Sequence, residues 1–218
     1  MSTIIITGSS GLVGSESVDF FCKKGFDVIG IDNNLRSFFF GKDSSTIWVK
    51  KRLLKKHKRF KHYNVDIRNI NGLKKIFKKY KNNISLVIHC AAQPSHDYGK
   101  NFPILDFNVN ATGTLNLLEM TKQYCPDSPF IFMSTNKVYG DNPNNLKFIE
   151  KSKRWELKKD HTYYKGIDED FSIDNCTHSF FGVSKTYADL IVQEYGKNVG
   201  LKTVCFRGGC ITGPNHSG

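Results

Sequence analysis

The glycine-rich stretch near the N-terminus constrains the fold of this chain more than any other feature. In "TIIITGSSGLVGS", residues 3–15, three isoleucines lead directly into a turn that contains Gly8, Gly11 and Gly14. Glycine permits a tight turn between a strand and a helix, and it lets backbone N–H groups approach an anion at the helix N-terminus. The stretch predicts a strand–turn–helix unit that binds a pyrophosphate, although three glycines alone could also form an ordinary turn of this kind.

Apolar runs alternate with helical patterns along the rest of the chain. The runs expected to form strands cover residues 3–8, 27–32, 60–66, 85–92, 129–135 and 202–209. Apolar residues at helical spacing predict helices over 70–80, roughly 103–124 and roughly 179–198. Continuous apolar strands are typical of parallel sheets covered on both faces, so we predict a Rossmann-type, doubly wound α/β sheet with right-handed crossovers.

The segment 141–177 interrupts this alternation. It is polar, contains scattered aromatic residues and is long for a connection in a compact domain. We therefore treat residues 1–218 as one dinucleotide-binding domain, in which 141–177 is a long loop inserted near the active site.

Asp32, at the end of the second expected strand, is the next candidate ligand-binding residue. A carboxylate there can accept hydrogen bonds from an adenosine ribose 2′-OH and would repel a 2′-phosphate, which favours NAD over NADP. The nearby Arg36 keeps NADP open, and Asp32 could also be a turn residue in "DNN". The glycines, the strand, the helix and Asp32 together favour dinucleotide binding.

The chain is strongly basic, with a formal net charge of +12. Lysines cluster in 50–61 and 74–81, which suggests either a site for nucleic acid or another polyanion, or a solvated lysine-rich surface. We favour the surface, because charge runs alone are weak evidence for a site. We therefore expect no nucleic-acid partner.

The six cysteines are scattered without a CxxC motif or a Cys/His cluster of metal-ligand spacing. The N-terminus lacks the basic region of a signal peptide, and no apolar run is long enough to span a bilayer. We expect reduced thiols in a cytoplasmic protein, with no metal site and no membrane association.

The order of the motifs resembles the extended short-chain dehydrogenase/reductase superfamily, which includes the nucleotide-sugar epimerases and dehydratases. The resemblance runs through "TGSSGLVGS" (7–15), "DIRN" (66–69), "HCAAQ" (89–93), "NVNATGTLNLLE" (108–119), "STNKVYGD" (134–141), "GVSK" (182–185) and "FRGGCITGP" (206–214). It covers the whole chain and implies an NAD cofactor.

The resemblance also implies roles for individual residues. It implies a cofactor site formed by Gly8, Ser10, Gly11, Leu12, Val13, Gly14, Asp32, Asn33, Asp66, Ile67, Ala91, Ala92, Gln93, Asn110 and Lys185. Thr135 would hydrogen-bond the reacting sugar hydroxyl, and Lys185 would bind the nicotinamide ribose and lower the pKa of a catalytic tyrosine. We include Tyr139 as the third catalytic candidate.

The residues after Thr135 favour one activity within the superfamily. The 4,6-dehydratases carry Asp-Glu there as acid and base, whereas this chain has Asn136 and Lys137. The resemblance therefore implies epimerisation of a nucleotide sugar, most closely C2 epimerisation of a CDP-linked dideoxyhexose through a keto intermediate in surface-polysaccharide synthesis. A 4-epimerase or dehydratase relative is the alternative.

Two features depart from the superfamily. Its Tyr-x-x-x-Lys motif is "FGVSK" here, so Phe181 stands one helical turn before Lys185, and phenylalanine carries no proton to transfer. Either another phenol serves (Tyr139, Tyr163 or Tyr164), or chemistry is lost and a non-catalytic NAD-binding module remains.

The second departure is length, because members normally continue into a C-terminal lobe that holds the nucleotide sugar. We expect a C-terminally truncated form that lacks most of this lobe. His96-Asp97 follows the fourth expected strand, where it could contact the sugar or cap a loop. A homodimer through the helices at 103–124 and 179–198 is also implied.

Overall fold

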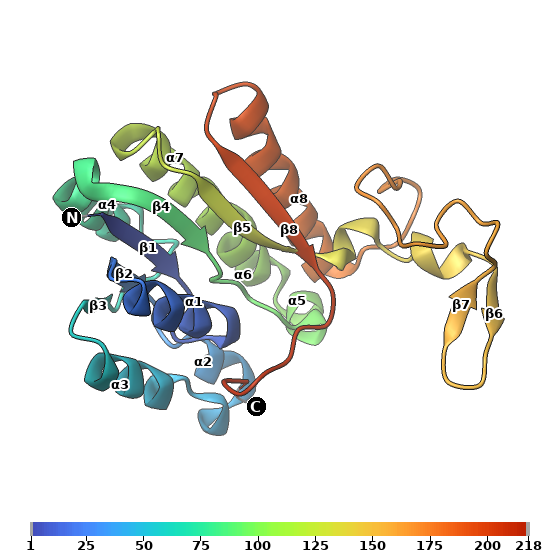
Figure 1. Ribbon diagram of the computed structural model, residues 1–218, viewed down its shortest axis with the longest axis horizontal. Helices are drawn as coiled ribbons and strands as arrows, with labels where there is room; N and C mark the ends of the chain where they lie inside the picture. The colour runs from blue at the N-terminus through green and yellow to red at the C-terminus, as the bar shows by residue number, and fades with distance from the viewer. Residues whose placement is uncertain (1, 217–218) are drawn as a thin grey trace.

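A six-stranded parallel sheet forms the centre of the computed structural model, which describes residues 2–216 (Figure 1). Its strands are β1 (Thr3–Thr7), β2 (Asp27–Ile31), β3 (Phe60–Tyr63), β4 (Ile84–His89), β5 (Phe130–Thr135) and β8 (Thr203–Gly208). All six predicted strands are present, in the order β3-β2-β1-β4-β5-β8. The predicted Rossmann-type sheet is confirmed, and its strand order reverses between β1 and β4, where such sheets bind ligands.

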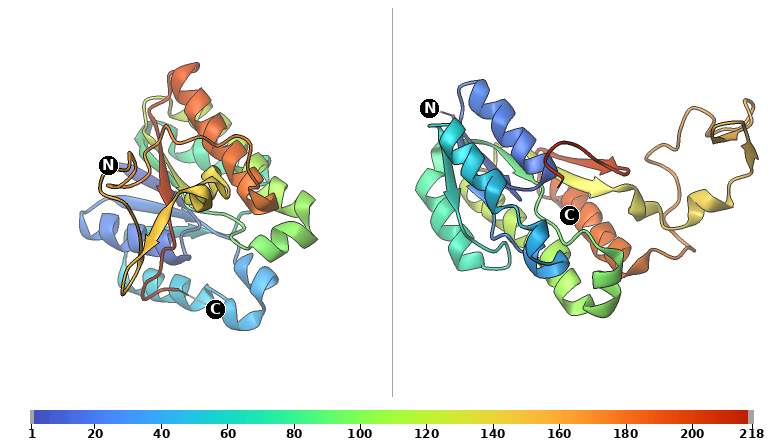
Figure 2. Two further views of the ribbon diagram at one scale, coloured as in Figure 1. Left: turned by 90° about the vertical axis from the view of Figure 1, so that its right-hand side faces the viewer. Right: turned by 90° about the horizontal axis from the view of Figure 1, so that it is seen from below.

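Helices cover both faces of the sheet (Figure 2). They are α1 (Leu12–Lys23), α2 (Arg36–Phe40), α3 (Ile47–Lys56), α4 (Ile70–Tyr80), α5 (His96–Asn101), α6 (Pro103–Phe107), α7 (Gly113–Tyr124) and α8 (Ser179–Lys197). The side chains of α1 and α3 pack with Ile4 and Ile6 in one core, whereas those of α4, α7 and α8 pack with Ile5 in the other. This division follows from the strand geometry, because successive side chains of β1 point to opposite faces.

The helix predicted over 103–124 is continuous but irregular. A π-helical turn, Asn108–Thr112, separates α6 from α7. Such turns are rare and frequently occur at functional sites. Here the turn contains the buried Asn110, whose side chain bonds to the segment that follows β4.

The segment 141–177 extends away from the sheet, at the right of Figure 1. It contains an antiparallel hairpin of β6 (Phe148–Glu150) and β7 (Trp155–Leu157), where a loop alone was predicted. We call residues 141–177 the arm.

The lysine-rich run at 50–61 includes most of α3. Val49 and Leu53 of this helix are buried, and Lys51, Lys55 and Lys56 on its other side are exposed. Across residues 2–216, no helix has both the length and the apolar character needed to cross a membrane.

Candidate functional site

The turn between β1 and α1 depends on close backbone approaches that only glycine allows. Gly8 adopts φ +64°, and a Cβ there would lie 2.7 Å from the backbone nitrogen of Ala91. A Cβ on Gly14 would lie 2.0 Å from the carbonyl oxygen of Gly8. The first turn of α1 therefore lies directly against the end of β1, with its unsatisfied N–H groups at the edge of the sheet.

Asp32, directly after the neighbouring strand β2, is hydrogen-bonded to this turn. Its Oδ2 accepts a hydrogen bond from the backbone N–H of Ser10 at 3.0 Å, and its Oδ1 accepts one from that of Asn34 at 2.8 Å. These bonds hold the carboxylate beside the glycine turn, where it can also accept from a ribose hydroxyl.

A pocket opens along the carboxyl ends of β1, β2 and β4. The predicted cofactor residues that line it are Gly8, Gly11, Leu12, Val13, Gly14, Asp32, Asn33, Asp66, Ile67, Ala91 and Ala92. Ser10 instead lines an adjoining hollow with Asp32, Lys50 and His62. The sequence did not single out Leu35, Thr46, Val65, Cys90, Pro94, Val109 and Met133, which also line the main pocket. Cys90 and Val109 lie within the motifs at 89–93 and 108–119, whereas the other five belong to none of the motifs that carry the resemblance.

Asp66 lies at the pocket wall as part of an ionic network. It accepts a hydrogen bond from Asn33 at 2.9 Å and forms an ion pair with Arg68 at 2.6 Å. Burial alone would raise the pKa of Asp66, but the hydrogen bonds from Arg68 and Asn33 lower it. The carboxylate is therefore ionised and fixes the orientation of the Asn33 amide.

Gln93 and Asn110 lie outside the lining of the main pocket, buried and bonded to each other. The backbone N–H of Gln93 donates to Asn110 Oδ1 at 2.8 Å, and Asn110 Nδ2 donates to the carbonyl of Gln93 at 3.1 Å. The amide of Gln93 also donates to Asp106 at 2.5 Å. In the structure, these two residues hold the segment after β4, including Ala91 and Ala92, against the π-helical turn.

Lys185 also lies behind the pocket wall, with its ammonium group buried. Nζ donates to the carbonyl of Met133 at 2.7 Å and lies 4.1 Å from the ring centroid of Phe132. Burial lowers the pKa of Lys185 to about 8, although Cys90 and Asp189 act against this shift. Met133 and Cys90 line the pocket, so the cation is next to the region where the nicotinamide half would bind.

The two predicted catalytic residues that follow Ser134 differ in their surroundings. Thr135 ends β5, and its hydroxyl accepts a hydrogen bond from the N–H of Lys137 at 3.2 Å. The hydroxyl of Tyr139 donates to the carbonyl of Asp168 at 3.0 Å and accepts from Arg207 at 2.9 Å. Tyr139 is buried, and its contacts tie the core to the arm.

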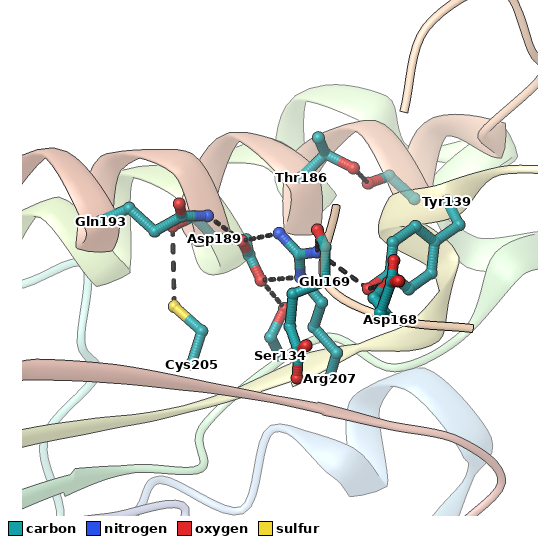
Figure 3. A network of polar contacts seen from close by, with 10 residues as sticks. Ser134, Tyr139, Asp168, Glu169, Thr186, Asp189, Gln193, Cys205 and Arg207 are labelled. Carbon is teal, nitrogen blue, oxygen red and sulfur yellow. Dashed lines mark hydrogen bonds and ion pairs between the residues drawn. The ribbon is translucent and has the colours of Figure 1, made fainter. Parts of the chain in front are cut away.

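Arg207 and Asp189 form the centre of that connection (Figure 3). Arg207 binds both carboxylate oxygens of Asp189, at 2.9 and 3.2 Å, and Ser134 donates to Asp189 at 2.5 Å. Arg207 also donates to the carbonyl of Glu169 in the arm. The sequence did not identify this network, because its members come from β5, α8, β8 and the arm and have no common motif.

The residues of the pocket fit a dinucleotide. A Cβ at Gly8 or Gly14 would clash with nearby backbone atoms, so only glycine permits this turn. Leu12 and Val13 line the pocket in the first turn of α1, where backbone N–H groups are available to an anion. In the adjoining hollow, the hydroxyl of Ser10 is one of three buried side-chain polar atoms without a hydrogen-bond partner among residues 2–216. A phosphate or ribose oxygen could accept a hydrogen bond from this hydroxyl.

The order of the strands, the glycine turn and the pocket together define a dinucleotide-binding α/β protein. The model of the family described as NAD dependent epimerase/dehydratase matches residues 4–218, and the chain belongs to this family. The predicted resemblance is confirmed, and so is the predicted cofactor, NAD, since the family description names it and a structural relative was solved with it.

Individual relatives are epimerases of nucleotide sugars. The CDP-paratose 2-epimerase of Salmonella typhi is 33% identical over 94% of this chain and 56% of its own length. The UDP-glucuronate 4-epimerase of Thermodesulfobacterium geofontis (strain OPF15) is 35% identical over 66% of this chain and 42% of its own. The Thermus thermophilus UDP-glucose 4-epimerase, solved in complex with NAD, matches with a TM-score of 0.68 at 26% identity, over 94% of this chain and 54% of that one. The chain thus spans about half the length of these relatives.

Proposed function

We propose that this chain is the NAD-binding part of a nucleotide-sugar epimerase, and that its substrate is a CDP-linked sugar epimerised at C2. The pocket carries the proposal, since it brings the glycine turn, Asp32 and Asp66 together at the point where the strand order reverses. The choice of sugar follows from the similarity to the CDP-paratose 2-epimerase, which extends over 94% of this chain. We also propose the cytoplasmic location and the homodimer that the sequence led us to expect.

Several residues of the chain would bind the cofactor and the sugar in such a reaction. The N–H groups of Leu12 and Val13 would bind the pyrophosphate, and Asp32 would accept from the adenosine ribose. When bound, NAD supplies a hydride acceptor that later returns the hydride. Thr135, at the carboxyl end of β5, would hold the reacting sugar hydroxyl, and Lys185 would bind the nicotinamide ribose. Asn136 and Lys137 stand where dehydratases need an acid and a base, which favours epimerisation.

Thermal melting tests cofactor binding. A ligand that binds only the folded state raises the melting temperature, and we expect NAD⁺ to do so more than NADP⁺. Asp32→Ala should remove this preference, whereas Asp43→Ala, at an exposed position on the surface, should keep it. A cooperative melt that NAD⁺ leaves unchanged would contradict the proposed cofactor site.

Turnover tests the proposed reaction. In a full-length version that includes a C-terminal lobe, we expect NAD⁺ and CDP-paratose to give the C2 epimer, which chromatography and NMR of the sugar protons would detect. A UDP-sugar epimerised at C4 would instead support the second candidate, which the UDP-glucuronate and UDP-glucose 4-epimerases among the relatives suggest. NAD⁺ binding without conversion of either sugar would support a non-catalytic NAD-binding module, the alternative that Phe181 suggests.

A further inference from the structure

The position one helical turn before Lys185 has no proton-transfer group. Phe181 occupies it, with only 7% of its surface exposed. An epimerase needs a group that takes the proton of a sugar hydroxyl and gives it back. If the proposed function holds, another side chain close to Phe181 has to provide this group.

His96 lies directly against the ring of Phe181. The two ring centroids are 4.9 Å apart, and the planes meet at 60°. His96 is exposed to solvent, whereas Phe181 is buried. The residue follows β4 and comes two positions after Pro94, which lines the cofactor pocket. An imidazole therefore lies next to the ring that stands in the tyrosine position.

One hydrogen bond reaches this imidazole, and two others hold the backbone of the residue before it. Nδ1 lies 3.0 Å from Oγ of Ser179, the first residue of α8. Ser179 adopts φ +62°, a strained conformation for a residue with a side chain, and its Oγ also accepts from the N–H of Gly182. On the other side, Gln93 bonds to the backbone N–H and carbonyl of Ser95, which precedes His96.

The contact with Ser179 can set the tautomer of His96. If Nδ1–H donates to Ser179 Oγ, the lone pair of the neutral ring lies on Nε2. Nε2 can then accept a proton. The groups that border the ring on α8 are the hydroxyl of Ser179 and the apolar ring of Phe181, and the charged residues of α5 itself are Asp97 and Lys100.

Two of the three tyrosine candidates make other contacts, and the third, Tyr164, lies in the arm and is 37% exposed. The hydroxyl of Tyr139 donates to Asp168 and accepts from Arg207. The ring of Tyr163 packs on Phe171 with centroids 5.0 Å apart, within the arm. Neither residue has a ring contact with Phe181 in the part of the chain that the structure describes.

We propose that His96 is the proton acceptor and donor of this epimerase, in place of the tyrosine that Phe181 replaces, and that Ser179 positions it. The inference rests on the proposed function. Nε2 of His96 would take the hydroxyl proton while the carbon–hydrogen bond breaks, and a bound NAD⁺ would supply the acceptor for the hydride that leaves with both electrons of that bond. The proton and the hydride return in the second half of the reaction, when imidazolium gives the proton back to the oxygen.

Turnover by variants of the full-length version gives the first test, with NAD⁺ and CDP-paratose as ligands. His96→Gln should lower kcat by about a hundredfold and leave KM nearly unchanged, because a general base acts in the transition state. Lys100→Gln, an exposed change on the same helix, should keep the wild-type rate. In the His96→Gln background, Phe181→Tyr should restore part of the rate, because it returns a phenol to the position one helical turn before Lys185. A wild-type kcat in His96→Gln would overturn the inference and leave the proposed function intact.

The tautomer of His96 gives a second test that needs no turnover. In ¹⁵N spectra of the wild-type chain, Nδ1 should carry the proton in the neutral ring, and Ser179→Ala should lower this preference. Adding CDP-paratose should shift the Nε2 resonance. A ring protonated at Nε2, or one that the nucleotide sugar leaves unchanged, would overturn the role of His96. If neither the wild type nor Phe181→Tyr converts the sugar, the proposed function fails as well, and the NAD⁺ melt shows whether the cofactor site survives.

Discussion

Gly14 is the residue at which the cofactor turn tolerates no side chain. A Cβ there would lie 2.0 Å from a backbone oxygen, which cannot move aside as a flexible side chain could. We expect Gly14→Ala to lower the free energy of unfolding by about 2–3 kcal/mol and to abolish the NAD⁺-dependent rise in melting temperature. Gly209→Ala is the control, because a Cβ at Gly209 would meet no atom within 4 Å among the described residues. Equal unfolding free energies for the two variants would contradict the tight turn.

Lys185 should make stability depend on pH in the alkaline range. Its pKa is lowered from 10.5 to about 8, because burial disfavours the cation. Between these values the unfolded state binds a proton that the folded state has released, so raising the pH stabilises the fold. Relative to Lys185→Met, the wild type should gain about 3 kcal/mol of unfolding free energy between pH 8 and 10.5.

Urea unfolding at a series of pH values measures this difference. Lys197→Met, an exposed change in the last turn of α8, should follow the wild type throughout. A difference between wild type and Lys185→Met that does not change with pH would mean that the ammonium group keeps an ordinary pKa.

At the scale of elements, the Arg207–Asp189 pair joins β8 to α8 and both to the arm. Burial would raise the pKa of Asp189, but hydrogen bonds from Arg207 and Ser134 lower it. Arg207→Met leaves this carboxylate buried without its partner, which should cost about 3–5 kcal/mol at neutral pH. The double variant with Asp189→Asn should recover part of the loss.

The pH dependence of this effect has a defined sign. A carboxylate whose folded pKa is lowered contributes stability above its unfolded pKa of 3.8, and this contribution is lost as the pH falls through the folded value. The difference between the wild type and Arg207→Met should therefore shrink on acidification. Denaturant unfolding between neutral and acidic pH measures it, and a constant difference would mean that Asp189 is not ionised in the fold.

The sequence predicted regular elements better than irregular ones. The six strands were predictable because parallel strands buried on both faces are continuous apolar runs, as in residues 3–8. The π-helical turn at 108–112 was not, since it arises from tertiary bonds between Asn110 and Gln93. The hairpin within the arm was also missed, because its strands are short and mostly exposed and carry little hydrophobic pattern.

The candidate site divides in the same way. Gly8 and Asp32 belong to a local sequence motif, and their proposed roles depend on the backbone or on a single carboxylate. The structure places both in the lining of one pocket. The contact between His96 and Phe181 joins positions far apart in the chain and depends on how α5 packs on α8. Sequence alone placed His96 at the ligand-binding edge but could not show what it touches.

At the scale of the whole molecule, the position of the pocket explains why half of a longer relative can hold a complete cofactor site. Its lining comes mainly from the carboxyl ends of β1, β2 and β4 and the segments that follow them, with further residues from the segment after β3, the π-helical turn and β5, all within this chain. The residues that we propose for sugar binding lie elsewhere, since Thr135 is the last residue of β5 and the arm follows soon after it in the chain. Cofactor binding and sugar binding should therefore be separable in this chain.

The net charge of +12 gives the last prediction, which concerns partners. The exposed lysines of α3 lie on a helix whose apolar side is buried, so they form a solvated face. Such a face attracts polyanions only through long-range electrostatic forces. Salt screens these forces beyond about 8 Å at physiological ionic strength. We expect RNA to bind at low salt and to be released near about 0.15 M salt. Lys51→Glu/Lys55→Glu on α3 and Lys74→Glu/Lys78→Glu on α4 should weaken the low-salt binding alike. Filter binding over a salt series measures RNA retention by the wild type and by both variants. If the wild type retains RNA at physiological salt and only the α3 variant loses this retention, α3 carries a specific site.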